Sequence, residues 1–415
     1  MTLSCAITGA WRADGRVHHP AQTDHLRGSH VALPQILLPS RYERADGTTR
    51  IPVTQDVKPG IAMPLVVGGP WTRQARDRAV DKEVRAAFER YFTKAMKVRN
   101  WVPNELPIKE MHEYGHLLSD DTVTIIQAYL GVEDFVGDYV EDGLNMLHNN
   151  RARRNLQIAW GMEEVKHAWA WELVLLHSGR RTEEELETYR DEVLSHKWTM
   201  RENHPGLDSP LGVICYTMVQ ERATYFNYDQ MRRRIRRECG LPEKMTPFER
   251  ARGMQIGAAG AFQIVGRDEI AHHGIFLELV RIYMTYFPTE TQEMLLRVFN
   301  GFTMPAINVI PDGADLEAAM RRTRLHTPRN QITDVNNPVL NALGYENKKA
   351  LERAVQQAKM LPGSLGPEHT VLSETGQWVL SMAEESDQPV GSDEPSAEDL
   401  ERHLNAPEVE APVAE

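Results

Sequence analysis

The chain has 415 residues, of which 41% are hydrophobic, enough for one large core or two domains of ordinary size. It contains no uninterrupted apolar run of roughly 18 residues, so we expect no membrane span. Its net charge of −12 is concentrated in residues 381–415, where eleven acids face one base, and the rest is close to neutral. We expect neither nucleic acid nor a membrane as a partner.

The amino-acid composition changes along the chain and predicts four regions. Residues 1–75 have scattered glycine and proline and little periodicity, so we expect an irregular extension. Residues 76–330 repeat apolar positions at helical spacing and predict an all-α bundle. We expect a helical or irregular extension over 331–380 and a disordered acidic tail over 381–415. Candidate helices lie at about 77–98, 120–148, 150–178, 183–202, 210–238, 247–285 and 288–300.

The three cysteines, Cys5, Cys215 and Cys239, are far apart and odd in number, which favours a reducing compartment over a disulfide framework. The first residues lack a basic start followed by an apolar stretch of leader length. Both features predict a cytoplasmic protein.

Four predicted helices carry acids or histidines within their apolar stripes, where hydrophobic residues would be expected. The helix period puts each stripe on one face. The stripes are Ile126, Leu130, Glu133, Val136 and Val140; Trp160, Glu164, His167, Trp171 and Val174; Ile214, Thr217, Glu221, Thr224 and Tyr228; and Phe262, Val265, Glu269, His272 and Phe276.

Carboxylates on the buried faces of a bundle are costly unless a cation balances them. Two Glu-x-x-His pairs and two single glutamates from four helices form the ligand set of di-iron and di-manganese bundles. Four carboxylates balance two divalent ions, and carboxylate with imidazole suits iron or manganese better than zinc or calcium. The predicted metal ligands are Glu133, Glu164, His167, Glu221, Glu269 and His272.

At these residues the sequence resembles the soluble acyl-carrier-protein desaturases, which introduce a double bond into a carrier-bound acyl chain. The similar segments cover roughly residues 95–313 in the order of the family. They are Asn100-Trp101-Val102-Pro103 with Leu106-Pro107, Glu163-Glu164-Val165-Lys166-His167 with Ser178-Gly179-Arg180, Gln220-Glu221-Arg222-Ala223-Thr224, Asp268-Glu269-Ile270-Ala271-His272, and Met304-Pro305-Ala306 with Asp312-Gly313.

The resemblance implies a ferritin-like bundle with two iron ions in its core, and dioxygen as co-substrate. It makes Glu164 and Glu269 bridging ligands and gives each iron one histidine. Asp268 would accept a hydrogen bond from a ligand histidine, His167. Thr224 would relay a proton, although a helix threonine can simply bond back to a carbonyl. Trp101 and Trp169 are candidates for an electron path or for core packing.

The resemblance also implies partners: an acyl carrier protein, a ferredoxin-type electron donor and a second copy of the chain. Because acyl carrier proteins are acidic, we expect basic docking residues. Lys94, Lys97 and Arg99 form one candidate patch, and the run from Arg232 to Arg237 forms a second. The interval from Thr224 to Glu269 is longer than in the family, which leaves the acyl chain and the oxidised position open.

The sequence leaves three alternative functions open. A hydroxylase of an acyl substrate would use the same iron ligands. His112-Glu113-Tyr114-Gly115-His116 fits the HExxH pattern of zinc peptidases, although Gly115 weakens a helix there. A ferritin-like iron store would share the metal ligands, but its chains are smaller. The resemblance favours oxygen-dependent desaturation over all three.

Overall fold

The computed structural model describes residues 73–147 and 150–360, which all belong to one compact unit. These residues form helices and loops without any β-strand, which confirms the all-α prediction. No helix among them is long and apolar enough to cross a bilayer. Nearly all of the extension expected over 1–75, the last part of that expected over 331–380, and the whole acidic tail lie outside the described residues.

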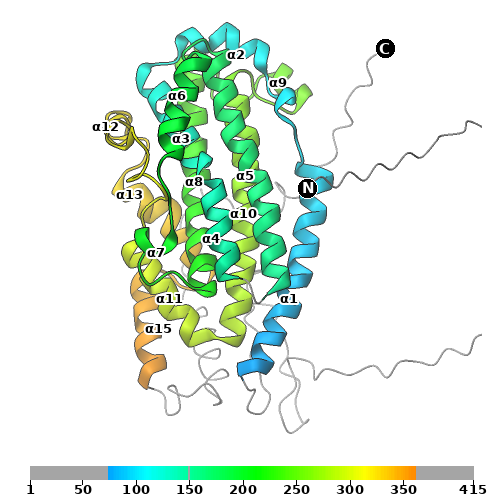
Figure 1. The fold of residues 1–415 in the computed structure, drawn as a ribbon, viewed down its shortest axis with the longest axis vertical. Helices are drawn as coiled ribbons and strands as arrows, with labels where there is room; N and C mark the ends of the chain where they lie inside the picture. The colour runs from blue at the N-terminus through cyan, green and yellow to red at the C-terminus, as the bar shows by residue number, and fades with distance from the viewer. Residues whose placement is uncertain (1–72, 148–149, 361–415) are drawn as a thin grey trace, which may run out of the picture. The chain divides into compact units, whose positions relative to one another are not determined.

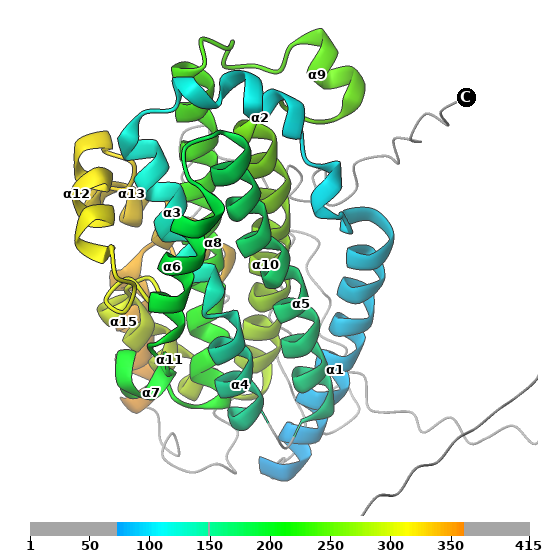
Figure 2. The ribbon, with the colours of Figure 1, turned by 45° about the horizontal axis from the view of Figure 1, so that its top comes forward.

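Four long helices form the centre of the unit, and they are the helices that carry the unusual polar stripes. They are α3 (Asp120–Asp134), α5 (Arg151–His177), α8 (Pro210–Glu238) and α10 (Ala258–Tyr286). α8 packs along α10, α3 packs along α5, and α5 also contacts α10. Figures 1 and 2 show these helices running alongside one another.

Further helices cover this central group. α1 (Arg73–Lys94) packs on α5 and α10, whereas α12 (Gly313–Thr323) packs on α3. The remaining elements are the helices α2 (Ile108–Tyr114), α4 (Val136–Met146), α6 (Glu183–Leu194), α7 (Met200–Asn203), α9 (Pro247–Arg252), α11 (Pro288–Gly301), α13 (Pro328–Asn330), α14 (Asn337–Ala342) and α15 (Lys348–Met360), and the short turns η1 (Ala95–Arg99), η2 (Pro103–Glu105), η3 (Gly115–Leu117) and η4 (Gln331–Asn336).

Side-chain caps fix where the central helices begin. The side chains of Ser119, Asn150 and Ser209 accept hydrogen bonds from the first-turn backbone amides of α3, α5 and α8. These amides have no partner inside the helix, so the caps stabilise each start by about 1 kcal/mol. The helix starts in turn set the register in which the ligand candidates face the core.

Three expected helices are interrupted: the one over 120–148 at Phe135, the one over 183–202 after Leu194, and the one over 247–285 between Gly253 and Gly257. Gly253 (φ 70°) is the left-handed residue that ends α9, and Gly257 has a positive φ of 61° at the N-cap of α10; glycine adopts both conformations at little cost. The apolar pattern continues through Phe135, which hid the first break. A Cβ at Gly161 would lie 2.3 Å from Val140 Cγ2, so glycine lets α4 pack closely on α5.

The arginine run near the end of α8 is mostly structural. Arg236 is fully buried, pairs with Glu249 at 2.5 Å, and also donates to the carbonyl of Pro242 at 2.7 Å. Arg232 and Arg233 both pair with Asp229. Because Arg236 is inaccessible, the run from Arg232 to Arg237 is not the continuous surface patch that the sequence suggested.

The buried pair gives a stability prediction. Glu249→Ala removes the partner of a buried guanidinium and should lower the free energy of unfolding by about 3 kcal/mol. Urea unfolding followed by circular dichroism measures it. Lys197→Ala, which breaks a solvent-exposed pair with Glu141, is the control and should leave the midpoint almost unchanged. Equal midpoints for the two variants would contradict the structural role of the Arg236 pair.

Candidate metal centre

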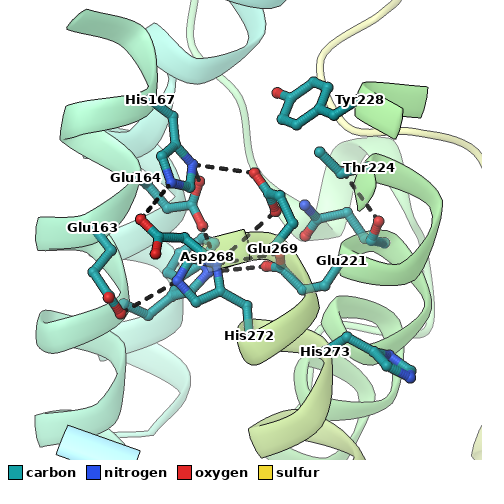
Figure 3. A network of polar contacts seen from close by, with 12 residues as sticks. Glu163, Glu164, His167, Glu221, Thr224, Tyr228, Asp268, Glu269, His272 and His273 are labelled. Carbon is teal, nitrogen blue, oxygen red and sulfur yellow. Dashed lines mark hydrogen bonds and ion pairs between the residues drawn. The ribbon is translucent and has the colours of Figure 1, made fainter. Parts of the chain in front are cut away.

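The structure brings all six predicted ligands together in the core. α3 supplies one glutamate, α8 supplies another, and α5 and α10 each supply a glutamate and a histidine one turn apart. Every one of them is buried, with at most 7% of its surface exposed. Figure 3 shows the cluster between α5, α8 and α10. The six residues are Glu133, Glu164, His167, Glu221, Glu269 and His272.

The six side chains form two overlapping groups, each able to hold a metal ion. One group is Glu133, Glu164, His167 and Glu269, and the other is Glu164, Glu221, Glu269 and His272. Within each group the candidate ligand atoms lie within 4.8 Å of one another. Because Glu164 and Glu269 belong to both groups, the arrangement offers two neighbouring positions joined by shared carboxylates.

Both histidines turn the same ring atom toward the shared carboxylates. His167 Nδ1 lies 2.9 Å from Glu164 Oε2 and 3.1 Å from Glu269 Oε1. His272 Nδ1 lies 2.9 Å from Glu164 Oε1 and 3.4 Å from Glu221 Oε2. One imidazole nitrogen from each ring is therefore presented to the carboxylate cluster (Figure 3).

Several buried atoms at the centre have no hydrogen-bond partner among the described residues. They include both carboxylate oxygens of Glu269, one oxygen each of Glu164 and Glu221, and Nδ1 of His272. These oxygens lie within ion-pair distance of the histidine rings but make no hydrogen bond, and carboxylates buried in this way cost several kcal/mol, which favours a bound cation between them. Carboxylate oxygens and imidazole nitrogens are ligands of divalent transition metals, and the residues fit such a group.

The pKa values of the buried carboxyl groups reflect the same mutual repulsion. Burial, followed by the charge of Glu164, raises the pKa of Glu133 to about 8. Burial and the neighbouring carboxylates of Glu164 and Glu221 raise the pKa of Glu269 well above its ordinary value. Burial would also raise the pKa of Glu164, but His167 and His272 outweigh it and lower the value to about 2. The two rings can balance only two of the four acids, and the raised pKa values mean that the other two hold a proton unless a metal ion balances their charge.

A second acid faces the outer nitrogen of each histidine. His167 Nε2 lies 3.5 Å from Asp268 Oδ2, the residue that the resemblance placed there. His272 Nε2 lies 3.3 Å from Glu163 Oε2. Such contacts fix the ring orientation and leave Nδ1 free for a metal. Glu163 was not predicted, although it precedes Glu164 just as Asp268 precedes Glu269, and that repetition was the available signal.

Arg99 connects these two outer acids. Its guanidinium lies 3.5 Å from Glu163 and 3.4 Å from Asp268, and only 3% of the residue is exposed. Tyr91 donates to Glu163, and Trp101 Nε1 donates to Asp268 at 2.6 Å. The expected docking role of Arg99 is therefore wrong, because the side chain lies beside the metal centre and not on the surface.

The two tryptophans singled out by the sequence differ in their positions. Trp101 is buried and bonded to Asp268, whereas Trp169 is half exposed on α5. Of these two tryptophans, only Trp101 is therefore connected to the centre by a hydrogen bond among the described contacts. That contact supports both an electron path and a packing role for Trp101.

Aromatic donors hold the two glutamates that each belong to only one of the two ligand groups, Glu133 and Glu221 (the outer glutamates). The Tyr228 hydroxyl donates to Glu133, and Trp160 Nε1 donates to Glu221 Oε1 at 2.9 Å. Both aromatic residues belonged to the predicted apolar stripes, but the sequence gave them no role beyond packing. Each donor occupies one carboxylate oxygen, and the other oxygen of Glu221 lies 3.4 Å from His272 Nδ1.

A cavity of about 580 Å³ reaches the centre from one side. Its inner part is lined by Glu133, Glu164 and Trp160, and most of the remaining lining is apolar. Thr224 also lines it, while its hydroxyl donates to the carbonyl of Gln220 at 3.1 Å. Thr224 therefore makes the ordinary helix contact and also faces the space beside the metal ligands.

The HExxH segment does not form a comparable site. His112, Glu113 and His116 are all exposed, and α2 ends at Tyr114, between the two histidines. None of the three belongs to a potential metal-binding group within the described residues. His112 Nε2 instead lies 3.2 Å from His177 Nδ1. The geometry of this segment does not support the zinc-peptidase alternative.

Comparison with known proteins adds no assignment, since neither a protein-family model nor a curated protein matches the chain. The buried acids and histidines of the two groups could hold metal ions.

The ligand set predicts metal content directly. Glu164→Ala and Glu269→Ala each remove a carboxylate shared by both groups, so each variant should lose bound metal after loading with ferrous iron. Metal analysis of the desalted protein gives the stoichiometry. The paired variant His112→Ala with His116→Ala is the control and should keep the wild-type content. Full metal content in either glutamate variant would disprove the assignment of that residue.

Proposed function

We propose that the chain is a di-iron oxygenase with a ferritin-like bundle that desaturates an acyl chain bound to an acyl carrier protein. The observation that carries the proposal is the pair of ligand groups sharing Glu164 and Glu269 at the inner end of an apolar cavity. Such a cavity suits a hydrocarbon chain, and the centre lies where a redox-active metal would reach one of its methylenes.

Charge and ligand type support two iron ions. Four carboxylates offset two divalent ions, which leaves the buried centre neutral. The ligands expected for one ion are Glu133 and His167, those for the other are Glu221 and His272, and the two shared carboxylates lie between them. Oxygen and nitrogen ligands without thiolate favour iron or manganese, and the proposed oxidation requires redox activity.

The bound iron pair would supply the activation of dioxygen and the removal of hydrogen from an unactivated methylene, with electrons from a ferredoxin-type donor. The residues of the chain prepare this chemistry. Tyr228 and Trp160 orient the outer glutamates, and Glu163 and Asp268 orient the histidines. These contacts hold the ligands before metal enters, which lowers the reorganisation needed during the reaction.

The cavity wall controls water and protons. Its apolar lining, including Tyr129, Val132 and Ile307, excludes bulk water from the side of Glu133 and Glu164. Thr224 places a hydroxyl on this wall, where it could pass a proton between the cavity and the cluster of metal-ligand candidates after leaving the Gln220 carbonyl. We assign Thr224 the role of proton relay as part of the same proposal.

Hydroxylation is the closest competing function, because it begins with removal of the same hydrogen. The two reactions differ in the second step, in which a desaturase removes a neighbouring hydrogen and a hydroxylase adds oxygen to the carbon. The similarity of Gln220-Glu221-Arg222-Ala223-Thr224 and the other segments to the desaturases favours the alkene.

Product analysis separates these outcomes. A carrier protein loaded with a saturated acyl chain, incubated with the iron-loaded protein, reductant and dioxygen, should lose two hydrogens per chain when examined by mass spectrometry. A gain of one oxygen atom would show hydroxylation instead. Glu269→Ala should give neither product. If the iron-loaded wild-type protein leaves carrier-bound chains of several lengths unchanged, the proposed function is wrong.

We also propose that two copies of the chain associate through α5. Its solvent-facing positions Ile158, Met162, Val165 and Trp169 are apolar and about half exposed. They recur at helical spacing and form one continuous stripe. A stripe of this kind along a helix is unusual for a face that stays in contact with water, and it fits packing against an identical helix.

Light scattering tests the association. The wild-type protein should have a mass close to twice 47.2 kDa at micromolar concentration. Ile158→Lys combined with Trp169→Lys should shift it toward the monomer, because both charges would be buried in the interface. Leu194→Lys combined with Phe248→Lys places the same charges on exposed apolar residues elsewhere and should not. A monomeric wild-type protein would refute the dimer.

A further inference from the structure

The cavity opens through the segments that follow the bundle. Among its lining residues, Glu133 and Glu164 are buried, whereas Thr303, Arg321 and Pro328 are exposed. The exposed residues come from the segment after α11, from α12 and from α13. The cavity therefore runs from Glu133 and Glu164 to a mouth at α12 and α13. Figures 1 and 2 show these two helices on the left.

Four arginines lie on the segments that form this mouth. Arg321, Arg322, Arg324 and Arg329 are all exposed, and no acidic residue occurs from position 318 to position 333. Arg321 lines the cavity itself, and Pro328, which precedes Arg329, lines it as well. We call these four residues the arginine rim.

Much of the charge of the arginine rim remains available to a partner. Arg321 pairs with Glu317 at 2.8 Å and Arg322 with Asp121 at 2.7 Å, but these four side chains are mostly or partly exposed. Within the described part of the chain, Arg324 and Arg329 take part in no ion pair. Exposed pairs are weak, so a strongly acidic surface could compete for Arg321 and Arg322 too.

We propose that the arginine rim is the docking surface for the acidic acyl carrier protein, whose acyl chain enters the cavity beside it. This inference rests on the proposed function and adds the location of the partner. The apolar cavity accepts the chain, and the rim attracts the anionic surface to which the chain is attached. Docking here points the chain directly at Glu133 and Glu164.

The form of the rim favours a protein partner over a single phosphate group. A pocket for one phosphate would gather its guanidinium groups around one buried point. The four arginines are instead spread over α12, the residue that follows it and α13, and all are exposed to solvent. An extended set of exposed cations fits an extended acidic surface, which an acyl carrier protein provides.

The position of the mouth also argues against the docking patch expected from the sequence. Lys94 is the last residue of α1, and Lys97 lies in η1 directly after it. α1 packs on α5 and α10, whereas α12 packs on α3. Figures 1 and 2 both place α1 and the α12–α13 region on opposite sides of the central helices. A carrier held at Lys94 and Lys97 would therefore face away from the mouth.

Two charge-reversed variants test the proposal. Arg324→Glu with Arg329→Glu changes the rim, and Lys94→Glu with Lys97→Glu makes the same change of charge on the opposite side. The probe is an acyl carrier protein bearing a saturated 16-carbon chain, with dissociation constants measured at about 50 and about 300 mM salt, because screening weakens exposed charge pairs. The rim variant should bind roughly tenfold more weakly at low salt, and added salt should weaken wild-type binding. The lysine variant should bind within about twofold of wild type.

Iron content and chain oxidation, measured in parallel, separate the two proposals. Unchanged carrier binding by the rim variant, or an equal loss of carrier affinity in the lysine variant, overturns the docking assignment. If the wild-type protein still oxidises the chain, the proposed function is unaffected by that result. An equal loss of affinity for a 16-carbon acyl-coenzyme A would also overturn it, because a small phosphate ligand would then explain the rim. A wild-type protein that neither binds the carrier nor oxidises its chain overturns both proposals.

Discussion

The arrangement of this protein depends on the burial of four carboxylates in a helical core. Glu133, Glu164, Glu221 and Glu269 come from four different helices, and each lies where a hydrophobic residue would stabilise the bundle. Without compensating positive charge, their mutual repulsion would oppose the packing of those helices. The contacts around them reduce this cost only in part, since several oxygens still lack a partner. A pair of divalent cations would satisfy both the charge and the unpaired atoms.

The residues around the carboxylates determine how such cations would be held. Arg99 bridges Glu163 and Asp268, and these acids turn the two histidines so that Nδ1 faces inward. The centre is therefore supported from the α1 side, while the cavity approaches it from the side of α12 and α13. One side of the centre is therefore packed against polar partners, and the other faces the cavity.

Sequence reasoning found the six central residues because each interrupts an apolar helical stripe. It also found Asp268, through a family resemblance. It could not show that Arg99 is buried, because an arginine just before a loop normally faces solvent and its partners lie far away in the sequence. The cavity could not be predicted from the sequence either, since α12 and α13 approach the centre only through tertiary packing. The helix break at Phe135 was missed because the apolar period continues across it. The break at Gly253 was missed because a single glycine is a weak signal.

The most direct test of the central claim is anomalous X-ray diffraction at the iron absorption edge, from crystals of the protein loaded with ferrous iron. Two anomalous peaks about 3.5 to 4 Å apart are expected, both between Glu164 and Glu269. One peak should also contact Glu133 and His167, and the other Glu221 and His272. A single peak, or iron bound outside these six side chains, would contradict the proposed di-iron centre.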